Sequence, residues 1–258
     1  MRDPGEGVSA TGVITTGAAR ERVPLAFEPV VTAAIGAMSG LGGGCSLYVY
    51  GSVATGTAVP PSSDVDLLTI GLPTSDAAAL GHELSARFAS QCRAVEIAAE
   101  QPADLVGEHD EAYGNRAFLH HYCVHLTGPR HHHGLAACAA DARAARAFNG
   151  DIVQHARRWR SAVPEEDPAT LGRRLARKTL FAVAGLVSMH DATWTTDRAM
   201  AAARWAELEP AVADDLARLL RWSDGIEAAS SRSVSETLDG IVARITDAFA
   251  QSIGLWDD

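Results

Sequence analysis

Two aspartates, Asp64 and Asp66, lie one residue apart in the segment SDVDLLTIGL, with apolar residues beside each of them. In a strand, side chains alternate between faces, so both carboxylates share one face while Val65 and Leu67 point into the core. Two neighbouring carboxylates repel each other unless a cation lies between them. Hard divalent cations such as Mg²⁺ prefer oxygen ligands, so the pair indicates a metal site. An isolated D-x-D is usually a solvated strand end or a loop, and this interpretation therefore depends on other residues.

A third carboxylate, Glu96, lies between Val95 and Ile97 in the apolar segment RAVEIAA. A lone charge inside an apolar strand needs a partner or a functional reason. A crossover helix over residues 75–91 would bring this strand beside the strand of Asp64. We therefore expect Glu96 to reach the same face as the two aspartates.

An anion site is predicted just upstream, where Gly51 and Ser52 follow the apolar run SLYVY. Glycine lets the backbone approach a ligand closely. The Ser52 hydroxyl and the exposed amides of a short helical turn in SVATG could hold a phosphate. A phosphate there and two metal ions on the carboxylates fit phosphoryl or nucleotidyl transfer.

The elements that would position these residues change in character near residue 135. Before it, β-like runs alternate with helical spacing. Strands are expected over residues 46–50, 63–72 and 92–100, and helices over 25–40, 75–91 and 115–126. After it, apolar residues recur at spacings of three and four, which predicts helices only.

The predicted fold class is α+β. We expect a flexible leader over residues 1–22, with a short strand near 13–16. A mixed-sheet domain follows over residues 23–135, and an all-α helical-bundle domain over 136–258.

Composition restricts the function classes. The chain has 258 residues and a formal net charge of −10, which disfavours a protein that mainly binds nucleic acid and suits a cationic partner. No apolar run reaches the roughly 18–20 residues that span a bilayer, and the N-terminal segment lacks the apolar block of a secretory signal. We therefore expect a cytoplasmic protein with no membrane segment. Its four cysteines are scattered singly and are expected to be reduced.

The segment YGSVATGTAVPPSSDVDLL contains an apolar residue, Gly-Ser, a spacer, and D-x-D between apolar residues. It resembles the signature of the DNA polymerase β-like nucleotidyltransferase superfamily over about residues 45–100. The helical half, with LARKTLFAVAGLVSMHDATWTTDRAMAAARWAELEP, is similar in layout to bacterial aminoglycoside adenylyltransferases of the streptomycin/spectinomycin type.

The resemblance implies that ATP or another NTP reacts with a hydroxyl of a small molecule, for example a cationic one such as an aminoglycoside. Gly51 and Ser52 would bind the phosphates, and Asp64 and Asp66 would bind two Mg²⁺ ions. The acceptor hydroxyl would attack the α-phosphorus, and pyrophosphate would leave. Glu96 would be the general base or a third metal ligand, and both roles stay open.

In the helical half, Lys178 and Arg198 are candidates for contact with the triphosphate, with Arg177 beside them. The related enzymes have a lysine in the segment that here reads TWTTDRAMAAARW, where Arg198 is the nearest basic residue. Trp194 could stack on the acceptor or the base, and Asp191 could bind a cationic acceptor. The alternatives are solvated helix faces for the basic residues, core packing for Trp194 and helix capping for Asp191.

Two further hypotheses remain. The histidines from His120 to His133 include His121 and His125, which on a helix would share a face and could bind zinc or the acceptor, or pack structurally. The alternative function is the nucleotidyltransferase component of a toxin–antitoxin pair, modifying or binding a protein partner. Such partner-dependent enzymes usually lack a large helical domain, which favours the small-molecule reaction.

Overall fold

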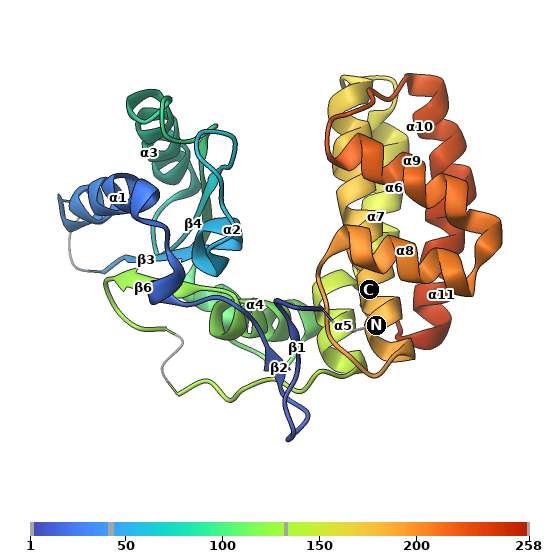
Figure 1. Cartoon of the computed structure of the whole chain (residues 1–258), viewed down its shortest axis with the longest axis horizontal. Helices are drawn as coiled ribbons and strands as arrows, with labels where there is room; N and C mark the ends of the chain where they lie inside the picture. The colour runs from blue at the N-terminus through green and yellow to red at the C-terminus, as the bar shows by residue number, and fades with distance from the viewer. Residues whose placement is uncertain (1–2, 41–43, 132–133, 257–258) are drawn as a thin grey trace. The chain divides into compact units, whose positions relative to one another are not determined.

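The computed structural model describes residues 3–40, 44–131 and 134–256 (Figure 1). Its internal contacts divide the chain into two compact units. The sheet unit is Thr16–Ala137, and the helical unit combines Met1–Thr15 with Cys138–Asp258. The predicted leader over 1–22 is thus divided between the units, because its first part packs with the C-terminal helices.

The sheet unit is built on a four-stranded mixed sheet, as predicted, in the order β5-β4-β3-β6. The strands are β3 (Ser46–Tyr50), β4 (Val65–Ile70), β5 (Val95–Glu100) and β6 (Val124–Thr127). β4 and β5 run parallel, joined by the crossover helix α3 (Thr74–Arg87), whereas β3 is antiparallel to both β4 and β6.

Helices cover both faces of this sheet, which is why β4 reads as a nearly continuous apolar run. On one face, Val65 and Leu67 join a core with α1 (Glu28–Gly40) and α3. On the other face, Leu68 and Ile70 pack with Leu119 of α4 (Asp110–His121). The unit also contains α2 (Gly51–Thr55) and the 3-10 turns Arg20–Arg22, Leu25–Phe27 and Pro102–Leu105.

The helix predicted over residues 115–126 is wrong at its C-terminal end. α4 ends at His121, and the chain then forms β6 against β3. The apolar spacing of FLHHYCVHL fits a helix, but VHLT also alternates in polarity, and pairing with β3 decides its conformation. Gly128 follows with φ +86. A Cβ there would collide with the Cys45 backbone.

The helical unit is a bundle centred on the long helix α7 (Pro168–His190), in agreement with the all-α prediction. Asp167 caps α7 by accepting a hydrogen bond from the Thr170 amide at 2.8 Å, with Pro168 in the first turn. Around it lie α5 (Ala142–Asn149), α6 (Ile152–Ala162), α8 (Arg198–Leu208), the 3-10 turn Pro210–Val212, α9 (Ala213–Ser223), α10 (Ser231–Thr237), the π-helical turn Leu238–Val242 and α11 (Ala243–Ser252).

The N-terminal segment belongs to this bundle. Its short strands β1 (Gly7–Val8) and β2 (Ile14–Thr15) pair antiparallel, close to the strand predicted near residues 13–16. Asp3 accepts a hydrogen bond from Thr195, and Glu6 accepts one from Thr196 at 2.7 Å. The segment is thereby bonded to the connection between α7 and α8. Within the described residues, no helix combines the length and the hydropathy that crossing a membrane requires.

Candidate active site

Two of the three predicted carboxylates are direct neighbours in the sheet. In the parallel pair of β4 and β5, Asp66 stands opposite Glu96, and on the other side Tyr50 stands opposite Asp66. Directly paired residues project to the same face, so both carboxylates lie on the face covered by α4. Asp64 lies immediately before β4, beyond the last paired residue, Val65.

Gly51 brings the backbone against the Asp66 carboxylate at the start of α2. Its φ of +67 is in the left-handed region that favours glycine. A Cβ at this position would lie 2.5 Å from Asp66 Oδ2. A larger residue would therefore displace the carboxylate, so the glycine is needed for both its conformation and its small size.

The turn that contains Ser52 is fixed by backbone hydrogen bonds. The Ser52 carbonyl accepts from the amides of Thr57 at 2.9 Å and Ala58 at 3.1 Å, and the Ala54 carbonyl accepts from the Ala19 amide at 3.0 Å. The Ser52 side chain is partly buried. Among the described residues, none hydrogen bonds to its hydroxyl, which leaves this group available to a ligand.

Arg93 is the residue of this site that the sequence analysis missed. Its Nε donates to Asp64 Oδ1 at 2.9 Å, and its Nη2 donates to Asp64 Oδ2. The Arg93 amide also donates to the Ser63 carbonyl at 3.1 Å, and the Val65 amide donates to the Ala94 carbonyl at 2.9 Å. The parallel register that follows from the crossover was the signal that could have placed residues 92–94 beside residues 62–64.

Several charges converge at this end of the sheet. The hydrogen bond with Asp64, together with Glu96 and Asp66, raises the pKa of Arg93. Burial, with the nearby charges of Asp66 and Glu96, raises the pKa of Tyr50, which stays a neutral phenol. In the part of the chain that the structure describes, no three His, Cys, Asp or Glu side chains form a ready metal cluster. Asp66 and Glu96 are adjacent, whereas Asp64 is bound to Arg93.

The other predicted site residues belong to the helical unit. Lys178 Nζ lies 2.6 Å from Asp151 Oδ1 and donates to the Phe148 carbonyl at 2.9 Å. Its pKa is lowered by burial, although the charge of Asp151 opposes this shift. The lysine is therefore fully engaged within the bundle.

Arg198, the first residue of α8, is less restrained. Its Nη2 lies 4.0 Å from Asp224 Oδ1, and its guanidinium lies over the ring of Phe181 at 5.9 Å. Burial and the like charge of Arg177 lower the pKa of Arg198. Asp224 and Asp197 oppose this shift, so Arg198 lies among two arginines and two aspartates.

Trp194 and Asp191 both lie in the connection between α7 and α8. Trp194 is 3% exposed and contacts the ring of Phe148 at 6.0 Å between centroids. Asp191 accepts from Arg204 Nε at 2.9 Å and forms a pair with His190 Nδ1 at 2.8 Å. These partners hold the pKa of Asp191 well below its usual range.

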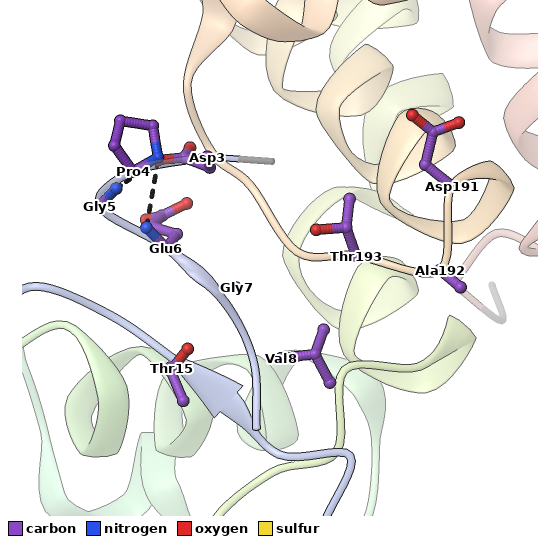
Figure 2. A pocket seen from close by; sticks show the side chains of 10 residues that line it. All are labelled: Asp3, Pro4, Gly5, Glu6, Gly7, Val8, Thr15, Asp191, Ala192 and Thr193. Atoms are coloured by element: carbon purple, nitrogen blue, oxygen red, sulfur yellow. Dashed lines mark hydrogen bonds between the residues drawn. The ribbon is translucent and has the colours of Figure 1, made fainter. Parts of the chain in front are cut away.

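A pocket of about 840 Å³ lies beside Asp191, between the N-terminal segment and residues 191–193 (Figure 2). Its acidic lining residues Asp3 and Glu6 are hydrogen bonded to Thr195 and Thr196. The two predicted substrate contacts, Trp194 and Asp191, therefore both have structural partners. Trp194 contacts Phe148, and Asp191 binds Arg204 and His190.

The histidines do not share a helical face. His121 ends α4, whereas His125 lies in β6, where its Nε2 is 2.9 Å from the Gly128 carbonyl oxygen. Burial lowers the pKa of His121 to about 4, and burial also lowers that of His125. His132 and His133 lie outside the described residues.

No protein-family model matches this sequence, and a search of curated proteins finds no match either. The structure is similar to that of a spectinomycin adenyltransferase from Enterococcus faecalis determined with ATP and spectinomycin. The TM-score is 0.54, the match covers 86% of this chain and 98% of that chain, and 11% of the residues are identical. The similarity covers most of both chains, so this chain shares the fold of that adenyltransferase.

Proposed function

We propose that this protein is a nucleotidyltransferase that transfers AMP from ATP to a hydroxyl of a small molecule such as an aminoglycoside. The observation that supports it most is the arrangement of Asp66 opposite Glu96, with the Gly51 backbone against the Asp66 carboxylate. The fold shared with the spectinomycin adenyltransferase supports the same reaction class. We expect the reaction to take place in the cytoplasm and without nucleic acid.

Mg²⁺ is the cofactor that the donor set suits. Asp66, Glu96 and Asp64 offer only carboxylate oxygens, which are the ligands that this hard ion prefers. When bound, Mg²⁺ would neutralise the negative charge of the phosphates and of the reacting phosphoryl group. Asp64 would join the ligand set once Arg93 releases it.

The chain's own groups would orient the reactants. The hydroxyl of Ser52 would donate to a phosphate oxygen, because nothing in the described chain satisfies it. Glu96 is exposed on β5 and would accept the proton of the acceptor hydroxyl as its oxygen bonds to the α-phosphorus. The bond from that phosphorus to pyrophosphate would break. The alternative role of Glu96 is that of a third metal ligand.

For the nucleotide contact in the helical unit, we favour Arg198 over Lys178. Lys178 is held by Asp151 and Phe148, so it would have to abandon both partners to reach a phosphate. Arg198 is 4.0 Å from its nearest printed carboxylate partner, Asp224, and lies over the ring of Phe181, which is 37% exposed and would contact a base. Trp194 and Asp191 stay predicted acceptor contacts.

The test is incubation with Mg²⁺ and each NTP, against a panel of aminoglycosides, other hydroxylated small molecules and whole lysate. The expected result is a mass gain of one nucleotide on a small molecule. The Asp66→Asn variant, shown to be folded by circular dichroism, should lose transfer. Label found only on a protein in the lysate would contradict this proposal and favour the toxin–antitoxin alternative.

A further inference from the structure

Arg93 is bound to one of the carboxylates of the proposed active site. Its guanidinium engages both oxygens of Asp64, at 2.9 Å from Nε to Oδ1 and through Nη2 to Oδ2. The Asp64 side chain is 16% exposed, whereas that of Arg93 is 63% exposed. The carboxylate is thus largely covered, while the arginine that binds it is largely exposed.

The charges around Arg93 explain why it lies there. Asp64, Asp66 and Glu96 all act on the guanidinium, and each of them stabilises its charged form. A guanidinium keeps its charge in proteins, and its planar fork matches a carboxylate and a phosphate equally well. An exposed ion pair contributes little to stability, so Arg93 can exchange one partner for the other at little cost.

We propose that Arg93 couples metal binding to nucleotide binding. This inference rests on the function proposed above. In the protein without metal and nucleotide, Arg93 neutralises Asp64. It moves to the triphosphate when the metal–nucleotide complex arrives. A metal ion alone must displace the guanidinium and leave it without a partner. A metal ion that arrives with a triphosphate releases Asp64 and provides a phosphate for the same guanidinium.

Coupling between two ligands is reciprocal and commonly changes each affinity by about 5- to 150-fold. The experiment measures binding of Mn²⁺, a paramagnetic substitute for Mg²⁺, by electron paramagnetic resonance with and without a non-hydrolysable ATP analogue. In the wild type, the analogue should tighten Mn²⁺ binding by a factor in this range. In Arg93→Gln, Mn²⁺ alone should bind more tightly, the analogue more weakly, and the coupling factor should approach one.

Arg87→Gln is the matched control, because Arg87 is exposed in the same unit and its guanidinium lies over the ring of Phe88. It should leave both affinities unchanged. Arg93→Lys, which keeps the charge and loses the fork, should retain part of the coupling. Thermal unfolding verifies that each variant is folded.

Unchanged Mn²⁺ affinity and unchanged coupling in Arg93→Gln, together with measurable nucleotidyl transfer, would overturn this inference alone. Absence of Mn²⁺ binding in the wild type and in both Arg93 variants, even with the analogue, would instead overturn the metal site of the proposed function. The two failures are therefore distinguishable.

Discussion

An ion pair from each unit joins a cation to an aspartate: Lys178–Asp151 in the helical unit and Arg93–Asp64 in the sheet unit. These two pairs differ in what surrounds them. In the helical unit, Lys178 and Asp151 are 19% and 13% exposed, and each has a second partner inside the bundle. Phe148 accepts from the lysine, and the imidazole of His155 lies 3.0 Å from Asp151. In the sheet unit, the side chain of Arg93 is 63% exposed and binds Asp64, whose side chain is 16% exposed.

The difference teaches that the charge most conspicuous in the sequence need not be the one beside the carboxylates of the proposed site. Lys178 is the only lysine of the chain and lies beside an apolar run, so it stood out. Its pair bridges α7 to the Asp151 turn between α5 and α6, where it has a structural role. Arg93 is one arginine among many, yet it is bound to the carboxylate cluster.

The largest effect should come from breaking the buried pair. Asp151→Ala would leave Lys178 buried without its carboxylate, and we expect the free energy of unfolding to fall by about 3–5 kcal/mol. Urea unfolding followed by circular dichroism measures this. The double variant with Lys178→Met should recover part of the loss, because both charges are then gone. A loss below about 1 kcal/mol would mean that the pair behaves like a surface pair.

The next effect concerns the backbone beside the carboxylates. Gly51→Ala forces a side chain into a left-handed conformation and against Asp66, so the free energy of unfolding should fall by about 1–2 kcal/mol. Displacement of the carboxylate should also reduce transfer about 100-fold. Gly36→Ala is the control, because Gly36 lies in α1 with nothing near its Cβ. It should raise stability by about 0.5–1 kcal/mol. Equal behaviour of the two variants would contradict the role of Gly51.

Of the three sites discussed so far, the exposed pair of Arg93 and Asp64 should contribute least to stability. Arg93→Ala should lower the free energy of unfolding by less than about 1 kcal/mol, because solvent screens the interaction. Urea unfolding at low and at high salt measures this, and the small difference from wild type should shrink in high salt. A loss as large as that of Asp151→Ala would remove the distinction between the two pairs and would assign Arg93 a structural role.

Local sequence patterns were enough to predict the mixed sheet and the helical bundle, because strands repeat every two residues and helices every 3.6. The cap of α7 was predicted from residue type, since aspartate is a preferred N-cap. The sequence was also enough to predict that the strand of Glu96 lies beside the strand of the two aspartates, since a short crossover helix joins adjacent parallel strands. β6 was missed because its four residues fit a helical pattern until they pair with β3.

The two ion pairs were not predicted from the sequence. Arg93 and Asp64 are 29 residues apart, and their contact depends on the register of two strands. Lys178 meets Asp151 through the packing of α7 against the α5–α6 turn, which no local pattern encodes. The bonds of Asp3 and Glu6 to the α7–α8 connection join residues that are 192 and 190 positions apart in the sequence. The sequence alone therefore indicated the carboxylates of the site and not their counter-charges.

The smallest effect on stability is expected at Glu100, a carboxyl surrounded by apolar and acidic groups. Glu100, at the other end of β5, lines an apolar pocket of about 70 Å³ with Leu68 and Phe118. Burial raises its pKa from 4.5 to about 7, and Asp104 and Glu111 add to the shift. The folded state therefore keeps a proton that the unfolded chain releases near pH 4.5.

Stability should therefore fall as the pH rises from about 4.5 to about 7, because the folded state binds more protons over that interval. The effect is small because the carboxyl is only half buried and solvent screens it. Glu100→Gln mimics the protonated form, so it should match the wild type at pH 5 and exceed its stability at pH 8. Urea midpoints at the two pH values measure this, with the exposed Glu83→Gln as control. If the stability of Glu100→Gln changes with pH as steeply as that of the wild type, the proton resides on another group. The burial of Glu100 would then have no measurable effect on stability.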